Sequence, residues 1–343
     1  MAAMNPADSL SGAPRLRLGL LPTPLIELRR LAAALGGPRL CMKRDDLIGL
    51  ALGGNKIRKL EFLLGEALAQ GCDAVITGGA TQSNHCRQTA AAAAVAGLEC
   101  HLALGGAPPP IPEGNLLLDH LFGAVIHWCS EERKGERIPE IARELAGAGR
   151  RPYVIPYGGS NAVGALGFVA AAAELRDQLS GLGHGIDAVV VPSSSGGTHA
   201  GLTVGVDLCG LSQQVIGVGI DKGEAGDPPY EAALARLANQ VAERVGLARP
   251  GRETPYAPAD FHVRHEYYGG GYGVVGDLER EAIRLTARHE GILLDPVYTG
   301  RAMGGLIDLI RRGEFRPSDN VLFWHTGGIP ALFGYARELA ASS

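Results

Sequence analysis

The chain has 343 residues, 46% of them hydrophobic and 20% charged, so it is long enough for two domains and can bury a large core. A formal net charge of −4 and an aromatic content of 5% argue against nucleic-acid binding, because such proteins carry basic surfaces and aromatic stacking platforms. No long uncharged apolar run occurs, and the N-terminal stretch lacks a basic segment followed by an apolar one. We therefore expect no membrane span and no signal peptide.

The six cysteines are scattered and form no CxxC pair, which favours reduced thiols and a cytoplasmic location. Cys86 lies in a candidate site, although a catalytic thiol there is the weaker interpretation.

Short runs rich in valine and isoleucine alternate with helical patterns along the chain. The runs end in glycine or serine, which is typical of parallel strands covered on both faces. The predicted strands lie in 73–79, 100–104, 124–128, 153–159, 187–197, 214–220 and 320–328. The predicted helices span 57–70, 87–97, 230–246 and 277–291, and the proline-rich segment 105–115 is a predicted loop. The fold class is therefore α/β with mostly parallel sheets, and such sheets bind ligands at the carboxyl ends of their strands.

A single lysine, Lys56, follows Gly53-Gly54-Asn55 directly before the predicted helix 57–70. One interpretation is a solvated residue at a helix start. The other is an amine held at a loop-to-helix junction, where a phosphate or an aldehyde cofactor could bind.

Two further segments join a strand to a helix through small polar residues. In 77–88 the cluster Thr81-Gln82-Ser83-Asn84-His85 could hold an anion at a helix start, or Ser83 or Asn84 could simply cap that helix. In 192–202 the run Ser193-Ser194-Ser195-Gly196-Gly197-Thr198 indicates a phosphate cradle, with a tight turn as the alternative. It matches neither the P-loop nor the dinucleotide fingerprint, so a single phosphate is the favoured anion.

Later in the chain, 293–306 brings Tyr298 and Thr299 to a turn before a helix, and Thr326 follows the last predicted strand. A core tyrosine and a capping threonine are the alternatives. The ten histidines show no metal-ligand spacing. Asp45-Asp46, beside Lys43-Arg44, favours an ion-paired turn over a metal site, and no GxSxG elbow of a hydrolase occurs.

These features together suit pyridoxal 5'-phosphate. Its aldehyde needs an amine, its phosphate needs a cradle, and its ring nitrogen needs a polar partner.

The motifs GGNKIRKLEFL, TQSNHCRQ, SGGTHAGL, DPVYTGRAM and HTGGIPALF resemble, in this order, the D-cysteine desulfhydrase and 1-aminocyclopropane-1-carboxylate deaminase family. The resemblance runs from about Leu21 to Ala340. It implies the two-domain, three-layer parallel-sheet fold of the tryptophan synthase β type (fold type II) and a homodimer. A large cofactor-binding domain would comprise 1–55 and 165–343, and a small inserted α/β domain would comprise 56–164.

The resemblance also implies roles for individual residues. Lys56 matches the Schiff-base lysine, Lys59 a phosphate-contacting lysine, and Asn84 the residue that bonds the phenolic oxygen of the cofactor. Ser83, with the backbone near Asn84 and His85, matches the binder of the substrate carboxylate. The remaining matches are the cradle residues Ser195, Gly196, Gly197 and Thr198, the active-site tyrosines Tyr272 and Tyr298, and Thr326 as the neutral partner of the pyridine nitrogen.

The subtype follows from three positions. Deaminases of this family usually read Gln-Ser-Asn-Gln, Tyr-Glu-Gly and Leu-Gly-Gly where this chain has His85, Thr299 and Thr326. All three match the desulfhydrase pattern, which implies β-elimination of D-cysteine, or a close β-substituted amino acid, to pyruvate, ammonia and sulfide. L-Cysteate sulfo-lyase and cyclopropane deaminase activity stay open as alternatives, and a non-catalytic cofactor carrier is a different class. Val275 departs from the usual proline and could alter the substrate pocket near Tyr272.

Overall fold

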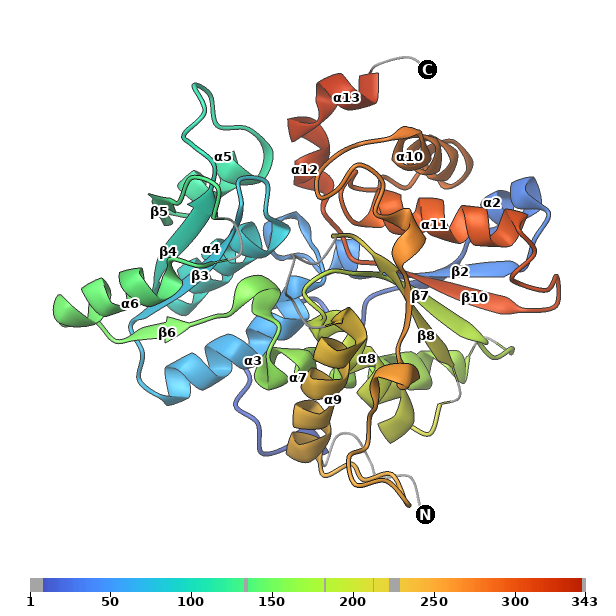
Figure 1. Cartoon of the computed structure of the whole chain (residues 1–343), viewed down its shortest axis with the longest axis horizontal. Coiled ribbons are helices and arrows are strands. Elements are labelled where there is room, and N and C mark those ends of the chain that lie inside the picture. The colour runs from blue at the N-terminus through green and yellow to red at the C-terminus, as the bar shows by residue number, and fades with distance from the viewer. Residues whose placement is uncertain (1–8, 133–134, 182, 212, 222–228, 341–343) are drawn as a thin grey trace.

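The larger of two sheets has six strands and forms one half of the molecule in the computed structural model, which describes residues 9–132, 135–181, 183–211, 213–221 and 229–340 (Figure 1). Its strand order is β1 (Leu25–Glu27), β2 (Arg39–Arg44), β10 (Asn320–His325), β7 (Ala188–Ser193), β8 (Gln214–Gly219) and β9 (His262–Arg264). Only β1 runs antiparallel to its neighbour. The carboxyl ends of the other five strands therefore meet at one edge.

The smaller sheet has four parallel strands in the order β5 (Val125–Trp128), β4 (Glu99–Gly105), β3 (Ala74–Ala80) and β6 (Pro152–Val154). All four come from the stretch 74–154, inside the segment 56–164 that we expected to form an inserted domain. Figure 1 shows this sheet beside the larger one. The helices α3 (Lys56–Ala69) and α7 (Ala162–Leu179) lie between and below the two sheets in this view. The domain boundaries themselves stay a prediction.

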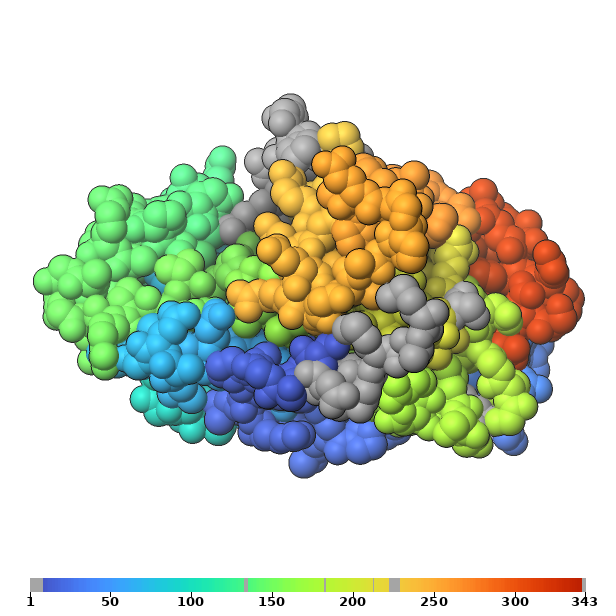
Figure 2. Space-filling view, turned by 90° about the horizontal axis from the view of Figure 1, so that it is seen from below, coloured from blue at the N-terminus to red at the C-terminus, as the bar shows by residue number. Residues whose placement is uncertain are grey.

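Helices cover both sheets. They are α2 (Arg29–Leu35), α3 (Lys56–Ala69), α4 (Asn84–Ala96), α5 (Gly114–Leu121), α6 (Ile138–Gly147), α7 (Ala162–Leu179), α8 (Gly197–Leu208), α9 (Tyr230–Val245), α10 (Asp277–Glu290), α11 (Thr299–Arg311), α12 (Ile329–Gly334) and α13 (Ala336–Ala340). Seen from below, α9 and the residues that lead to β9 cover the centre of the molecule (Figure 2). Among the described residues, no helix combines the length and hydropathy that crossing a bilayer requires.

The four predicted helices and the strands β3, β4, β5, β7, β8 and β10 are confirmed. The predicted strand 153–159 is wrong beyond Val154, because Pro156 precedes a short 3-10 turn in which Gly158 takes a φ of 64°. The strand β2 has no counterpart among the predicted strands, since its sequence RLCMKR ends in charged residues. Those charges are nevertheless buried or nearly so.

Glycines bring α3, α7 and α8 unusually close together. A Cβ at Gly167 of α7 would lie 2.1 Å from the carbonyl oxygen of Arg58, and one at Gly201 of α8 would lie 2.5 Å from that of Ala165. Only glycine fits at such distances. The helix α7 therefore packs directly against the backbones of α3 and α8 and sets the distance between these two helices. This packing fixes the start of α3 relative to the start of α8.

A buried network of charges ties α3 to the large sheet. Arg58 lies 2.8 Å from a carboxylate oxygen of Asp45 and 2.9 Å from Glu174, and Asp45 also accepts a 2.8 Å hydrogen bond from the indole of Trp324. Burial alone would raise the pKa of Glu174, but its contacts with Arg58 and Lys43 lower it to about 2. The ion-paired turn predicted at 43–46 is thus confirmed, with Arg44 and Asp46 paired at 2.7 Å.

We expect Asp45→Ala to destabilise the fold strongly, because it would leave the Arg58 guanidinium buried with one partner fewer. Breaking a buried ion pair in this way costs about 3–5 kcal/mol of unfolding free energy. Urea unfolding followed by circular dichroism measures the loss. Asp177→Ala is the matched control, since that carboxylate pairs with Arg176 at 69% exposure and should cost less than about 1 kcal/mol. Equal losses in the two variants would contradict a stabilising role for the buried network.

Candidate active site

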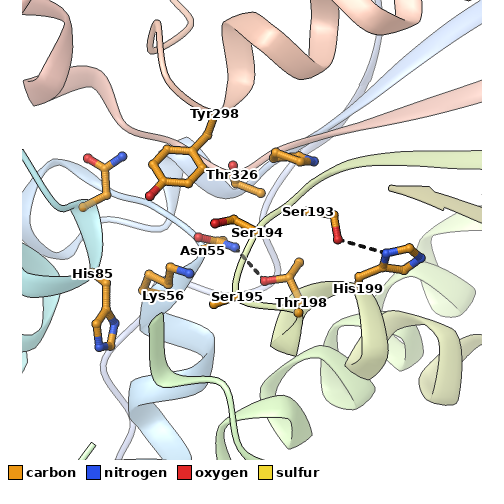
Figure 3. Close-up of a pocket in the computed structure, with 13 residues that line it drawn as sticks. Asn55, Lys56, His85, Ser193, Ser194, Ser195, Thr198, His199, Tyr298 and Thr326 are labelled. Atoms are coloured by element: carbon orange, nitrogen blue, oxygen red, sulfur yellow. Dashed lines mark hydrogen bonds between the residues drawn. The ribbon is translucent and has the colours of Figure 1, made fainter. Parts of the chain in front are cut away.

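A pocket opens at the carboxyl ends of β7 and β10, where the first residues of α3, α4 and α8 converge (Figure 3). Its lining residues are Asn55, Lys56, Asn84, His85, Pro192, Ser193, Ser194, Ser195, Gly196, Thr198, His199, Tyr298 and Thr326. The pocket thus unites five segments that lie far apart in the sequence. Eight of the predicted site residues line it, and Ser83, Lys59, Gly197 and Tyr272 lie outside that lining.

Lys56 is the first residue of α3 and reaches into the pocket. Its Nζ lies 3.3 Å from the carbonyl oxygen of Gly158. The side chain is partly exposed because it lines the pocket, yet the surrounding atoms desolvate its amine and lower its pKa to about 8. Lys56 is therefore a desolvated amine that lines the pocket, and not a solvated lysine on the surface.

Lys59 lies one helical turn further along α3 and is fully buried. Its Nζ donates to the carbonyl oxygen of Gly158 at 3.1 Å and to the hydroxyl of Ser160 at 3.0 Å. Burial, followed by the nearby charge of Lys56, lowers the pKa of Lys59 well below its ordinary value. The two amines thus share one carbonyl acceptor beside the pocket.

Ser160 connects Lys59 to the predicted cradle. Its hydroxyl accepts a hydrogen bond from the backbone N–H of Gly197 at 3.1 Å and lies 2.7 Å from the hydroxyl of Ser195. Gly196 has a φ of +86°, and a Cβ at Gly197 would lie 2.7 Å from the Ser160 hydroxyl and 2.8 Å from Lys59 Nζ. These glycines leave a shallow concavity of N–H groups, hydroxyls and an amine at the start of α8. Such a donor set suits a phosphate.

At the start of α4, the capping role expected as one interpretation of this segment is present, and it leaves the anion-binding interpretation open. The hydroxyl of Ser83 accepts from the N–H of Cys86 at 3.2 Å, so Ser83 is the N-cap of α4. His85 lines the pocket, and its Nε2 lies 2.9 Å from the hydroxyl of Thr77. Burial, with the charges of Lys56 and Lys59, lowers the pKa of His85 well below its ordinary range. The imidazole is therefore neutral.

The thiol of Cys86 does not have the properties of a nucleophile. It is fully buried, and burial raises its pKa well above the ordinary value. The thiolate that nucleophilic catalysis would require is therefore disfavoured.

Two tyrosines meet above the pocket. The hydroxyls of Tyr272 and Tyr298 are 2.8 Å apart and their rings cross at 77°, with Tyr298 lining the pocket. Burial, and then the nearby Tyr272, raises the pKa of Tyr298 well above its usual value, so it stays protonated. Val275 is buried outside the pocket lining.

Asp295 holds the turn that carries Tyr298. Its carboxylate accepts from the N–H groups of Val297, Tyr298 and Thr299 at 3.2, 3.1 and 2.7 Å, and from the hydroxyl of Thr299 at 2.7 Å. Thr299 is consequently fully buried and lies outside the pocket lining, whereas Thr326 lines the pocket. The two threonines that distinguish the subtypes therefore have different environments.

Among the residues of this region that were not predicted as site residues, we single out three that form hydrogen bonds there. Asn55 lines the pocket and donates to the Thr198 hydroxyl at 3.1 Å. His199 lines it too, with Nδ1 3.0 Å from the Ser193 hydroxyl, and burial lowers the pKa of this histidine to about 4. The third is Ser160, and its position after Gly158-Gly159, in a Gly/Ser turn like that of the cradle, was the available signal.

Comparison with known proteins agrees with this site. A family model described as pyridoxal-phosphate dependent enzyme matches residues 16–327. D-Cysteine desulfhydrase of Klebsiella pneumoniae (strain 342) is 45% identical over 97% of this chain and 99% of its own length. D-Cysteine desulfhydrase of Salmonella newport (strain SL254) is 44% identical over 96% and 98%.

Solved structures show the same fold. A crystal structure of an ACC deaminase homologue has a TM-score of 0.87 at 38% identity and covers 98% of each chain. Threonine deaminase isoform 2 from Solanum lycopersicum has a TM-score of 0.66 at 17% identity, covering 98% of this chain and 87% of its own, and indicates the fold alone. The predicted fold of type II is thereby confirmed, and the chain belongs to the family of pyridoxal-phosphate-dependent enzymes.

Proposed function

We propose that this enzyme is a carbon–sulfur lyase that eliminates sulfide from D-cysteine and yields pyruvate and ammonia. Two observations support this reaction. Relatives with this printed activity match almost the whole chain at 44–45% identity. In addition, no carboxylate side chain lines the pocket within the described part of the chain, and this observation carries the choice of reaction type.

The pocket residues fit pyridoxal 5'-phosphate. Lys56 would hold its aldehyde and Asn84 its phenolic oxygen, while Thr326 would face its ring nitrogen. Its phosphate would take the donors of Lys59 and the cradle Ser195, Gly196, Gly197 and Thr198. When bound, the cofactor supplies an electron sink for the bond electrons released at the substrate Cα.

Proton movement would fall to the side chains around that carbon. With a pKa of about 8, the free amine of Lys56 is neutral in a useful fraction near neutral pH and can take the α-proton of the substrate. The hydroxyl pair of Tyr272 and Tyr298 would hydrogen-bond near the substrate and orient that amine. The N-terminus of α4, with Ser83 and the backbone at Asn84 and His85, would bind the substrate carboxylate.

A neutral partner for the ring nitrogen would favour elimination over ring opening. The hydroxyl of Thr326, which lines the pocket, would leave a pyridine nitrogen largely unprotonated and the ring a weaker electron sink. Sulfide departs readily once the α-proton is removed, whereas opening a cyclopropane has no comparable leaving group. The deaminase therefore ranks second. It stays a candidate because the chain is 38% identical to an ACC deaminase homologue.

L-Cysteate sulfo-lyase stays an alternative because a sulfonate is also a good leaving group. A non-catalytic carrier is disfavoured by the presence of Lys56, Ser83 and Tyr298 together, since storage of a cofactor needs no site for a substrate carboxylate. The homodimer and the cytoplasmic location that the sequence led us to expect stay predictions, as does an effect of Val275.

We expect the purified enzyme to release sulfide and pyruvate from D-cysteine, with little or no ketobutyrate from aminocyclopropane carboxylate. A transition-state deficit of about 4 kcal/mol for ring opening corresponds to roughly a thousandfold lower rate. Parallel assays of kcat/KM, with L-cysteate as a third substrate, decide between the candidates. Comparable values for D-cysteine and the cyclopropane would overturn the argument from Thr326.

Attachment of pyridoxal 5'-phosphate to cofactor-depleted enzyme should speed up with rising pH and level off above about pH 8. The reason is that only the neutral amine of Lys56 attacks the aldehyde, and burial lowers its pKa from 10.5 to about 8. Absorbance after mixing gives the rate, and borohydride reduction with peptide mapping identifies the lysine. A label on another lysine, or a rate that still climbs near pH 10 as for an ordinary amine, would disprove the assignment.

Ser83→Ala should lower kcat/KM for D-cysteine by about tenfold or more while changing cofactor affinity little. Losing one hydrogen bond to a charged group costs roughly 1.5–3 kcal/mol. The capping role of Ser83 adds a loss of stability, so Ser83→Thr serves as the control that keeps both the hydroxyl and the cap. Parallel falls in substrate use and cofactor affinity would refute a specific carboxylate contact.

A further inference from the structure

A fully buried arginine lies behind Asn84. Arg87 of α4 donates from Nη1 to Oδ1 of Asn115 at 2.9 Å and from Nη2 to the carbonyl oxygen of Gly53 at 2.6 Å, and its Nη1 lies 3.4 Å from Oδ1 of Asn84. Burial lowers the pKa of Arg87 to about 10, so it is charged at neutral pH. The predicted active-site residues do not account for this buried cation.

Asp119 and Asp295 are the acidic side chains whose charges act on Arg87, but neither forms a hydrogen bond with it among the described residues. The two carboxyl oxygens of Asp119 and Nε of Arg87 are all buried without hydrogen-bond partners among the described residues. Burial raises the pKa of Asp119 well above its ordinary value, which favours the uncharged carboxylic acid. The hydrogen bonds of Arg87 therefore go to amide oxygens, namely those of Asn115, Asn84 and Gly53.

The guanidinium determines the direction of every hydrogen bond in this cluster, because it has donors and no acceptor. Facing Arg87, Asn115 must present its oxygen. Its Nδ2 then donates to the carbonyl oxygen of Gln82 at 2.8 Å and to Oδ1 of Asn84 at 2.9 Å. Asn84 must in turn present its oxygen to Asn115. Its Nδ2 is then the remaining polar group of this side chain that can face the pocket, which Asn84 lines.

We propose that Arg87 and Asn115 are positioning residues that lock the amide of Asn84 with its N–H group toward the cofactor. A locked donor bonds an oxygen that carries negative charge, and the adjacent cation polarises the amide and strengthens that bond. An unlocked amide can rotate and present its oxygen instead, which repels the same atom. The arrangement thus selects the form of the ring in which its phenolic oxygen is ionised.

The same helix turn also couples Asn84 to Lys56. Arg87 binds the carbonyl of Gly53 in the turn before Lys56, and the next residue, Gln88, accepts from the N–H of Ile57 at 3.2 Å. Gln88 also donates to the carbonyl oxygen of Asn84 at 3.1 Å. The starts of α3 and α4 are therefore held at a fixed separation, so the amine and the amide reach the same ligand together.

Asn115→Asp tests the proposal with a change of almost no volume. The carboxylate can still accept from Arg87 but cannot donate to Asn84, so the amide is expected to turn over. We expect the dissociation constant for pyridoxal 5'-phosphate, measured by equilibrium dialysis with the full chain, to rise about tenfold or more. The absorption band of the bound cofactor should move as well. Asn115→Ala, which removes the donor without adding repulsion, should raise the dissociation constant less.

The stabilities of the two variants should follow the opposite order to their cofactor affinities. This difference distinguishes a loss of Asn84 positioning from a general loss of stability. The new carboxylate pairs with Arg87, so Asn115→Asp should unfold at a urea concentration closer to wild type than Asn115→Ala, which leaves a cavity. Thr286→Val is the control for changing a buried polar side chain away from the pocket. It removes a buried hydroxyl of α10 that has no partner among the described residues, and it should leave cofactor affinity unchanged.

A double-mutant cycle identifies the route of the effect. In an Asn84→Ala background, Asn115→Asp should change cofactor affinity less than twofold, because no amide remains to be turned. A full tenfold loss in that background, or a greater loss of affinity for Asn115→Ala than for Asn115→Asp, would overturn the proposal. The inference rests on the proposed contact of Asn84 with the cofactor and not on the substrate, so it can fail while the proposed lyase activity holds.

Discussion

The rest of this structure depends on two lysine amines that share the carbonyl oxygen of Gly158 and must be held beside the pocket. Lys56 and Lys59 lie one helical turn apart with Nζ atoms 3.3 and 3.1 Å from that oxygen. Desolvation lowers the pKa of both, and no carboxylate lines the adjoining pocket within the described residues. The two amines therefore lack a negative partner among the described residues of the pocket. An anion at the start of α8 would supply one, since helix N-termini and ammonium groups both favour negative charge. The cofactor phosphate is such an anion.

Holding two amines at this place requires a rigid support, and the chain supplies it in two ways. Gly167 and Gly201 allow α3, α7 and α8 to approach until backbone contacts backbone, which fixes the spacing between the lysines and the cradle. The buried pairs of Arg58 with Asp45 and Glu174 then fix the direction of α3 against the large sheet. A buried ion network adds little net stability by itself, but breaking it is costly, so it restricts α3 to one arrangement.

Polar groups in the pocket are oriented by neighbours that lie outside it. Asp295 binds three successive N–H groups and the Thr299 hydroxyl, and this places Tyr298 toward the pocket and Thr299 away from it. Of the two threonines only Thr326 then lines the pocket, and it is the one that we propose as the partner of the ring nitrogen. In the proposed mechanism, the preference for elimination consequently depends on where Asp295 directs this turn, as well as on which residue types occupy positions 299 and 326. Asn115 and Arg87 orient Asn84 by the same principle.

The sequence by itself determined the α/β class, the order of the confirmed helices and strands, and most of the residues that line the pocket. These features are local, because periodicity and Gly-rich turns mark where strands end and helices begin, and Lys56 and Gly196 lie at such junctions. The tertiary structure alone decided which side chains cooperate. Ser160 contacts Lys59 across 101 residues of chain, and Trp324 binds Asp45 across 279. It also made Ser83 a helix cap and removed Thr299 from the pocket. Such contacts depend on how distant segments pack together and on the directions in which donors and acceptors point. A pattern of residue types along the chain carries no information about either.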